Sequence, residues 1–298
     1  MDKVYSFVAD KIGVRLDKFV GEECSALSRT QAQKLINSGY ITVNDRVTKL
    51  GFKLNIGDRV DIIIPPIAST SLSHEAIPVS IIYEDDDLLV VDKPSGLAVH
   101  PAPGHPNHTL VNAILPHLSG LAEASDSLRP GVVHRLDKDA SGIMVVAKNN
   151  TAQLNLINQF KAHSVGKVYL VLVKGHLTPE NGLIEAPIGR DPRNRKRMAV
   201  VADGREARTR YNVVKYIGDY TLLEVRTETG RTHQIRVHLS AIGYSVVGDN
   251  VYGVKSSFLS RQFLHACRLG FHLPSTGEYV EFTSDLSPDL AQALKNID

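Results

Sequence analysis

The sequence predicts an α+β fold, in which a mixed, largely antiparallel central sheet follows a small N-terminal α/β unit. Strand-like and helix-like segments alternate irregularly along the chain, whereas a doubly wound fold would repeat strand–helix–strand units of similar length. No Walker A run occurs and no GxGxxG motif follows a strand, so the sequence supports no nucleotide cofactor. A Pro- and Ser-rich stretch separates the two parts of the chain.

That stretch covers residues 65–80 and reads PPIASTSLSHEAIPVS, a composition typical of a linker. We therefore expect an N-terminal domain of residues 1–65, a linker of residues 66–80 and a larger domain of residues 81–298.

The composition is that of an ordinary globular protein, with 43% hydrophobic and 22% charged residues. A formal net charge of +2 permits a polyanionic partner without requiring one. The two cysteines, Cys24 and Cys267, are too few for a disulfide framework or a zinc ribbon and favour a reducing cytosol. The N-terminus does not resemble a signal peptide, and no apolar run approaches the roughly 18 residues of a membrane span. We expect a cytoplasmic protein without a membrane partner.

In the N-terminal domain, residues 29–38 are predicted to form a helix, because their apolar side chains follow helical spacing. Ser28 is expected to cap this helix and Gly39 to end it. Short strands, separated by Asn-Asp and Gly-Asp turns, are predicted at residues 40–43, 51–54 and 59–64. Four basic residues could share a helical face, a pattern that more often marks a solvated surface; they are Arg15, Lys18, Arg29 and Lys34.

After the linker, strands and helices are both expected from the hydrophobic patterns. Strands are predicted at residues 81–91, 142–148, 167–174, 208–216 and 220–226. Helices are predicted at residues 110–118, 152–161 and 234–241.

The most informative segment is RPGVVHRLDKDASGIMVVAKNN, residues 129–150. Its cations and carboxylates at residues 134–139 stand directly before small residues and an apolar strand. Such a segment can hold a charged group at a sheet edge that faces a cleft. A surface turn with solvated ion pairs explains the same residue types equally well.

The order of elements in the N-terminal domain resembles the S4 domain, a small RNA-binding module. The matching residues are Leu16-Asp17-Lys18, Ser28-Arg29, Ile36, Gly39, Val43-Asn44 and Gly57-Asp58-Arg59-Val60. The resemblance implies an RNA partner, with Arg15, Arg29 and Lys34 as RNA-binding residues. It implies nothing about chemistry.

Residues 134–148 resemble the signature of the RluA-type pseudouridine synthases, His-Arg-Leu-Asp-x-x-Thr-Ser-Gly followed by an apolar strand that ends in Ala-Lys. Ala140 stands where that signature usually has Thr, which removes a hydroxyl but leaves the aspartate intact. Three further blocks resemble the family in the expected order: VDKPSGLAVHP at residues 91–101, KVYLV at 167–171 and TGRTHQIRVHL at 229–239. With the S4-like domain, the layout is most similar to members that modify large-subunit ribosomal RNA.

The resemblance implies an isomerase that converts uridine in RNA to pseudouridine without a cofactor or a metal, because no redox change occurs and no group is imported. Asp137 would be the essential carboxylate, acting either as nucleophile or as base. Arg236 would keep this acid ionised and aimed. Tyr169 would stack on the uracil, and Arg135 would contact the RNA around the extruded base.

Residues 190–210 carry an excess of cations interrupted by Pro192 and Gly204. They predict a mobile arm or hairpin that grips phosphates, with Arg193, Arg195 and Arg197 as RNA contacts; a solubilising loop is the alternative. We expect 23S ribosomal RNA or a pre-ribosomal particle as the substrate. We also expect a monomer, because enclosing RNA needs no second subunit.

Other interpretations explain parts of the sequence. His100, His105 and His108 could reach one metal ion, but prolines stiffen their loop and no acidic or cysteine ligand stands beside them. His134 could form a dyad with Asp137, whereas the family resemblance gives it a structural role. A non-catalytic RNA-binding protein would leave the four blocks of the larger domain unexplained. A glycoside hydrolase would want two carboxylates and aromatic sugar platforms, yet the chain has no Trp.

Overall fold

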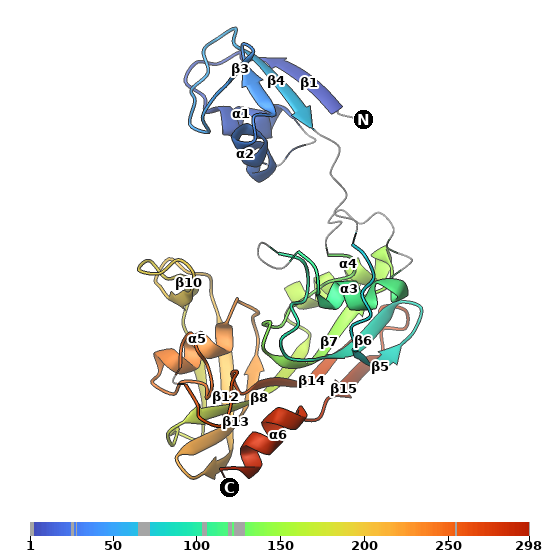
Figure 1. Cartoon of the computed structure of the whole chain (residues 1–298), viewed down its shortest axis with the longest axis vertical. Coiled ribbons are helices and arrows are strands. Elements are labelled where there is room, and N and C mark those ends of the chain that lie inside the picture. The colour runs from blue at the N-terminus through green and yellow to red at the C-terminus, as the bar shows by residue number, and fades with distance from the viewer. Residues whose placement is uncertain are drawn as a thin grey trace. The chain divides into compact units, whose positions relative to one another are not determined.

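The computed structural model describes residues 3–24, 27, 29–64, 72–102, 106–118, 121, 129–253 and 255–297. The chain forms two compact units, residues 1–71 and 72–298 (Figure 1), and each is described by itself. Ser28, Pro65 and residues 66–71 of the expected linker lie outside the described residues. Residues 72–79 belong to the second unit, where Glu75 accepts a hydrogen bond from the backbone N–H of His108.

The N-terminal unit packs two helices, α1 (Leu16–Glu23) and α2 (Arg29–Asn37), against an antiparallel sheet. The sheet order is β1-β4-β2-β3, formed by β1 (Lys3–Val8), β4 (Arg59–Ile64), β2 (Ile41–Val43) and β3 (Arg46–Val47). Apolar residues at helical and alternating spacing meet in one core, as Leu16, Ile36 and Ile62 do.

Two predictions for this unit are wrong. Residues 51–54 form no strand, because only Lys53 pairs, in an isolated bridge with Arg15. The four basic residues do not share one helical face: Arg15 precedes α1, Lys18 lies in it, and Arg29 and Lys34 lie in α2. The two arginines converge instead on the buried carboxylate of Asp17.

The second unit is built on a sheet of nine described strands, in the order β5-β6-β7-β14-β8-β13-β12-β9, with β15 paired to β14 (Figure 1). Among the described strand pairs of this sheet, only β7 and β14 run parallel. The predicted mixed, largely antiparallel sheet is therefore confirmed. The strands are β5 (Ser80–Glu84), β6 (Leu88–Lys93), β7 (Ser141–Ala147), β8 (Gly166–Lys174), β9 (Asn181–Glu185), β12 (Arg208–Ile217), β13 (Tyr220–Thr227), β14 (Leu264–His272) and β15 (Tyr279–Thr283).

Four helices and a 3₁₀ turn accompany this sheet within the described residues: α3 (Leu110–Ile114), η1 (Leu115–His117), α4 (Asn150–Lys161), α5 (Gln234–Ala241) and α6 (Pro288–Lys295). A separate hairpin of β10 (Ile188–Arg190) and β11 (Met198–Val200) lies in the cation-rich segment, near α5 (Figure 1). Across the part of the chain that the structure describes, no helix combines the length and apolar character that crossing a membrane requires.

Two predicted elements of this unit are broken in the structure. The strand predicted at residues 81–91 is the hairpin β5–β6, because the Asp85 carboxylate accepts hydrogen bonds from the backbone of Asp87 and Leu88 and fixes a turn. The helix predicted at residues 110–118 is α only as far as Ile114. Pro116 has no N–H to donate, so the chain continues as the 3₁₀ turn η1.

Gly142 allows β7 and β14 to approach each other closely in the middle of the sheet. Its φ of +114° lies in a region that L side chains rarely adopt, and a Cβ there would stand 2.2 Å from the carbonyl oxygen of Ala266 on β14. The loop that leads into β7 therefore emerges next to β14 and β8, where the candidate site lies.

Candidate active site

The loop of residues 134–140, here called the Asp137 loop, runs directly into the buried strand β7. His134 fixes its start, since Nε2 accepts a hydrogen bond from the backbone N–H of Val145 at 3.0 Å. The His134 ring also stacks on Phe160, with ring centroids 4.7 Å apart. Burial, and then the charge of Lys167, lower the pKa of His134 to about 3, so the ring is neutral. His134 thus contacts β7 and α4.

Two buried cations hold the end of the Asp137 loop through its backbone. Lys93 is fully buried, and its Nζ donates to the carbonyl oxygens of Pro94, Leu97 and Lys138 at 2.8–3.0 Å. Arg261 donates to the carbonyl oxygen of Asp139 at 3.0 Å and to both carboxylate oxygens of Asp289. The side chains of Lys138 and Asp139 themselves are exposed. The backbone on both sides of Asp137 is therefore fixed.

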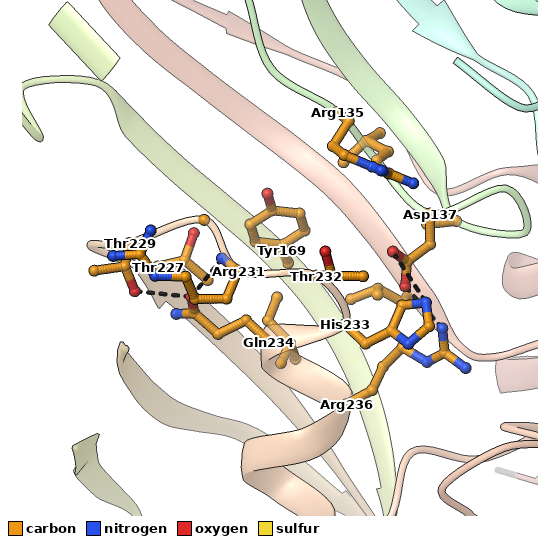
Figure 2. Close-up of a pocket in the computed structure, with 15 residues that line it drawn as sticks. Arg135, Asp137, Tyr169, Thr227, Thr229, Arg231, Thr232, His233, Gln234 and Arg236 are labelled. Atoms are coloured by element: carbon orange, nitrogen blue, oxygen red, sulfur yellow. Dashed lines mark hydrogen bonds and ion pairs between the residues drawn. The ribbon is translucent and has the colours of Figure 1, made fainter. Parts of the chain in front are cut away.

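Arg236, from α5, joins two carboxylates. Its Nε and Nη2 donate to Asp249 at 2.7 and 2.8 Å. Its Nη1 donates to Oδ2 of Asp137 at 2.8 Å, and Figure 2 shows this second pair. Asp249 is fully buried, while the Asp137 side chain keeps 16% of its surface exposed. Burial alone lowers the pKa of Arg236, but the hydrogen bonds and charges of the two aspartates outweigh it and raise the pKa. Arg236 is therefore charged and aimed by Asp249.

His233 and Tyr252 complete the surroundings of this ion pair. His233 stands before α5 in the left-handed backbone region (φ 57°), and its Nε2 lies 3.9 Å from Oδ1 of Asp137. Its Nδ1 hydrogen-bonds the Tyr252 hydroxyl at 2.9 Å, and the Tyr252 ring lies 5.1 Å from the Arg236 guanidinium. Burial lowers the pKa of His233, and the opposing charges of Asp137 and Arg236 follow as smaller causes.

Gln234 braces the turn between β13 and α5. Its Oε1 accepts hydrogen bonds from the Thr229 hydroxyl and the Arg231 backbone N–H, and its Nε2 donates to the Arg208 carbonyl. This turn forms the wall of the pocket opposite the Asp137 loop.

The Asp137 pocket has a volume of about 80 Å³ and lies between the Asp137 loop, β8 and the start of α5 (Figure 2). Tyr169 contributes an aromatic face from β8. Burial raises the pKa of Tyr169 to about 12, so its hydroxyl keeps its proton; the hydrogen bond with Thr227 lowers the pKa and the charge of Asp137 raises it. The pocket can therefore hold a flat ring between a phenol and a carboxylate.

The residues predicted for the site separate into three places. Asp137, Tyr169, Arg236 and Arg135 all line the same pocket. Arg193 and Arg195 are exposed in the turn of the β10–β11 hairpin. Arg197 is instead partly buried, and its guanidinium lies 5.2 Å from the Tyr252 ring. Arg15, Arg29 and the exposed Lys34 belong to the N-terminal unit.

Several site residues had no predicted role. His233 and Lys93 stand within two of the motif blocks, so their position in those blocks was the available signal. Asp249 and Tyr252 lie outside every predicted element, and no local pattern marks them. Among the described residues, no group of His, Cys, Asp or Glu side chains is arranged to hold a metal ion. His105 lies outside the described residues, and His108 contacts Glu75.

The sequence and fold match known proteins along nearly the whole chain. The family model of RNA pseudouridylate synthases matches residues 87–241, and that of the S4 domain matches residues 14–60. The uncharacterized RNA pseudouridine synthase YlyB of Bacillus subtilis is 43% identical over 95% of this chain and 94% of its own length. The ribosomal large subunit pseudouridine synthase D of Zymomonas mobilis is 40% identical over 96% of this chain and 94% of its own.

A solved structure has the same fold in the larger unit. Human RNA pseudouridylate synthase domain containing 1 superposes with a TM-score of 0.58 and 29% identity, covering 74% of this chain and 96% of that one. The predicted family, the S4 domain and the fold class are thereby confirmed. The chain belongs to the RNA pseudouridylate synthase family, a family of RNA isomerases, and carries an S4 domain at its N-terminus.

Proposed function

We propose that this enzyme isomerises uridines of large-subunit ribosomal RNA, with Asp137 as the essential carboxylate and without a cofactor. The observation that carries the proposal is the asymmetry of the Asp137 carboxylate. Oδ2 is held by Arg236 at 2.8 Å, whereas the ion pair of Oδ1 with Nε2 of His233 is longer, at 3.9 Å, and is not a hydrogen bond. Oδ1 is the oxygen left to react.

The reaction breaks the N1–C1′ bond of uridine and forms a C5–C1′ bond. Oδ1 can start it in either of two ways: it attacks C1′ as a nucleophile, or it removes the proton from C2′. Both routes need an ionised acid in a pocket that excludes most water. The charged Arg236, paired with both Asp137 and Asp249, orients the Asp137 carboxylate. The freed base then turns against the Tyr169 ring, and C5 bonds to C1′. On the first route this step releases Oδ1 from C1′, and on the second route C2′ takes its proton back from Asp137. C5 then loses its proton and N1 gains one.

The choice of large-subunit ribosomal RNA rests on relatives. Synthase D of Zymomonas mobilis and its counterpart in Nitrosomonas europaea, 41% identical to this chain, are both described as acting on the ribosomal large subunit. We further propose that the chain acts in the cytoplasm, where the free cysteines Cys24 and Cys267 would stay reduced, and that it acts as a monomer, because enclosing RNA needs no second subunit. Sedimentation would then give a mass near 32.6 kDa.

Chemical mapping of pseudouridine in unmodified transcripts tests the proposal. Wild-type protein should modify defined uridines in large-subunit ribosomal RNA and none in a pool of transfer RNA transcripts. Asp137→Asn should leave both RNAs unmodified, while Asp139→Asn, which changes an exposed carboxylate two residues away, should act as wild type. Modification of the transfer RNA pool alone would refute the substrate, and modification by Asp137→Asn would refute the role of Asp137.

A further inference from the structure

A second, larger pocket adjoins the Asp137 pocket. It has a volume of about 500 Å³, within the range of roughly 300–1,000 Å³ that small ligands occupy in proteins. The two pockets share Arg135, Tyr169, Thr227, Gly230 and Arg231, so they are neighbours with a common wall. We call the larger one the Lys167 pocket.

The Lys167 pocket has one apolar side and one cationic side. Val133, Ile157 and Phe160 contribute the apolar side. The cationic side chains are those of Arg135, Lys161, Lys167, Arg205 and Arg231. No Asp or Glu lines it among the described residues. This combination suits a ligand that has both a flat apolar part and a negative charge.

Lys167 differs from three of the other cations in its burial: Arg135, Lys161 and Arg205 are exposed, whereas Lys167 is partly buried. It stands two residues before Tyr169 on β8, so both side chains lie on the same face of the sheet. Its ammonium group makes no hydrogen bond or ion pair with a described residue; it lies 5.8 Å from the centroid of the Phe160 ring, and its charge acts on the neutral His134. Burial lowers the pKa of Lys167 to about 8. A half-buried ammonium without an acid is costly unless a ligand supplies the negative charge.

Arg231 and Arg205 add to the same positive field. Arg231 is held in place because its Nε donates to the Glu206 carbonyl oxygen at 2.9 Å. Burial lowers the pKa of Arg231, and the nearby charge of Arg205 lowers it further, whereas Glu206 raises it. The two guanidinium groups are therefore close enough to repel each other, and an anion between them would relieve that repulsion.

We propose that the Lys167 pocket binds the nucleotide adjacent to the target uridine, with its phosphate on Lys167 and its base or ribose against Phe160 and Ile157. The assignment to RNA rests on the proposed function. The shared wall is the reason to choose a polymer: a strand that leaves a base in the Asp137 pocket reaches the Lys167 pocket past Tyr169 and Arg135. A phosphate here positions the neighbouring ribose without taking part in the chemistry.

Lysine acylation measures occupancy of the pocket directly, on the wild-type full-length protein. The probe is a ten-residue oligouridylate, and the reagent is an amine-acylating anhydride with the modified lysines read by mass spectrometry. Lys167 should be protected by the oligouridylate, and Lys174, exposed at the far end of β8, should not. An oligouridylate with neutral methylphosphonate linkages should protect neither. Equal acylation of Lys167 with and without the natural oligonucleotide would overturn the proposal.

Kinetics of Lys167→Met against Lys174→Met supply the second test. With the large-subunit transcript, Lys167→Met should raise KM about tenfold, the loss expected for one charge-assisted hydrogen bond, and leave kcat within twofold. Its affinity should depend less on salt, with the slope of log K against log salt shallower by about 0.7. Lys174→Met should match wild type. An unchanged KM and salt slope in Lys167→Met would refute a phosphate contact.

The two proposals fail differently. The acylation experiment needs no turnover. The protection of Lys167 is therefore measured independently of the activity of Asp137→Asn. Conversely, the enzyme could modify the ribosomal transcript while the oligouridylate leaves Lys167 unprotected. That result would support the proposed function and refute only the adjacent subsite.

Discussion

Each unit of the chain contains an arginine–aspartate cluster, and the two clusters are built the opposite way round. In the N-terminal unit two arginines surround one acid: Arg15 and Arg29 both donate to Asp17, which is fully buried, at 2.9–3.4 Å. The arginine side chains remain 50% and 56% exposed. In the second unit two acids surround one arginine: Asp137 and Asp249 flank Arg236, which is 6% exposed.

This difference in arrangement determines whether the exposed part of each cluster is positively or negatively charged. Burial raises the pKa of Asp17, but hydrogen bonds from Arg15, Gln33 and Arg29 outweigh it and hold the pKa far below its usual range. That buried anion fixes two exposed cations, as a surface that binds phosphates requires. Around Arg236 the buried cation fixes a carboxylate that stays partly exposed, as a reacting acid requires. We therefore expect the same pair of residue types to serve RNA binding in the N-terminal unit and the proposed chemistry of Asp137 in the second unit.

Removing the centre of the second cluster should have the largest effect. Arg236→Met leaves Asp137 and Asp249 without their cation, so we expect loss of stability of about 3–5 kcal/mol, as for other broken buried ion pairs. Pseudouridine formation should fall below detection. Urea denaturation and chemical mapping measure the two effects. Near-normal turnover by this variant would show that the Asp137 carboxylate needs no guanidinium.

A substitution of Asp249 tests the orientation of Arg236 while the positive charge of Arg236 is kept. Asp249→Asn keeps the shape of a fully buried side chain but weakens the bidentate hold on Arg236. We expect kcat to fall about 100-fold, the order of loss that a small misplacement of a reacting group causes. KM should stay within threefold. The exposed Asp285→Asn is the matched control, and a rise in KM with normal kcat would contradict this role for Asp249.

Removing the centre of the first cluster should give the opposite kinetic pattern. Asp17→Asn frees Arg15 and Arg29, and we expect RNA affinity to fall about tenfold, equivalent to about 1.4 kcal/mol. The N-terminal unit should lose about 2 kcal/mol of stability, less than a fully buried pair because both arginines are half-exposed. The single-turnover rate at saturating RNA should be unchanged. A slower saturated rate would place this unit in the chemistry as well.

His134 provides the smallest test, because it holds the Asp137 loop without any ionic partner. Its pKa in the folded state is about 3, below the ordinary value of 6.5, so the unfolded chain binds more protons between these values. Stability should therefore be complete above pH 6.5 and be lost as the pH falls toward 3. His134→Gln can still accept the Val145 hydrogen bond but cannot be protonated. Its melting temperature should decline less than that of wild type between pH 7 and pH 4; parallel declines would contradict the assignment.

Local patterns predicted the elements whose own residues show a clear hydrophobic pattern. The segments of β8, β13 and α5 were found within one residue at each end, because strong apolar alternation or helical spacing marks them. Strand β14 was missed, since its polar His265 and Arg268 hide the alternation. It also owes its place to a parallel partner, β7, more than a hundred positions away along the chain.

The residues of the candidate site also divide into those that local motifs predicted and those that only the folded chain reveals. Asp137, Tyr169 and Arg236 were predicted because they stand in recognisable motifs, and the fold brings them to one pocket. Asp249 could not be predicted, because only the folded chain brings its carboxylate to Arg236. Lys167 stands in a predicted strand, but the absence of an acidic partner among the described residues is a property of the pocket and not of the sequence.

The most direct measurement compares RNA binding and chemistry in one variant. For Asp137→Asn, with Asp139→Asn as control, the dissociation constant of the large-subunit transcript and the single-turnover rate of pseudouridine formation are measured on the same samples. We predict binding within twofold of wild type and a rate at least about 1,000-fold lower, the scale of a missing catalytic acid or base. A rate within tenfold of wild type would contradict the claim that Asp137 is the reacting carboxylate.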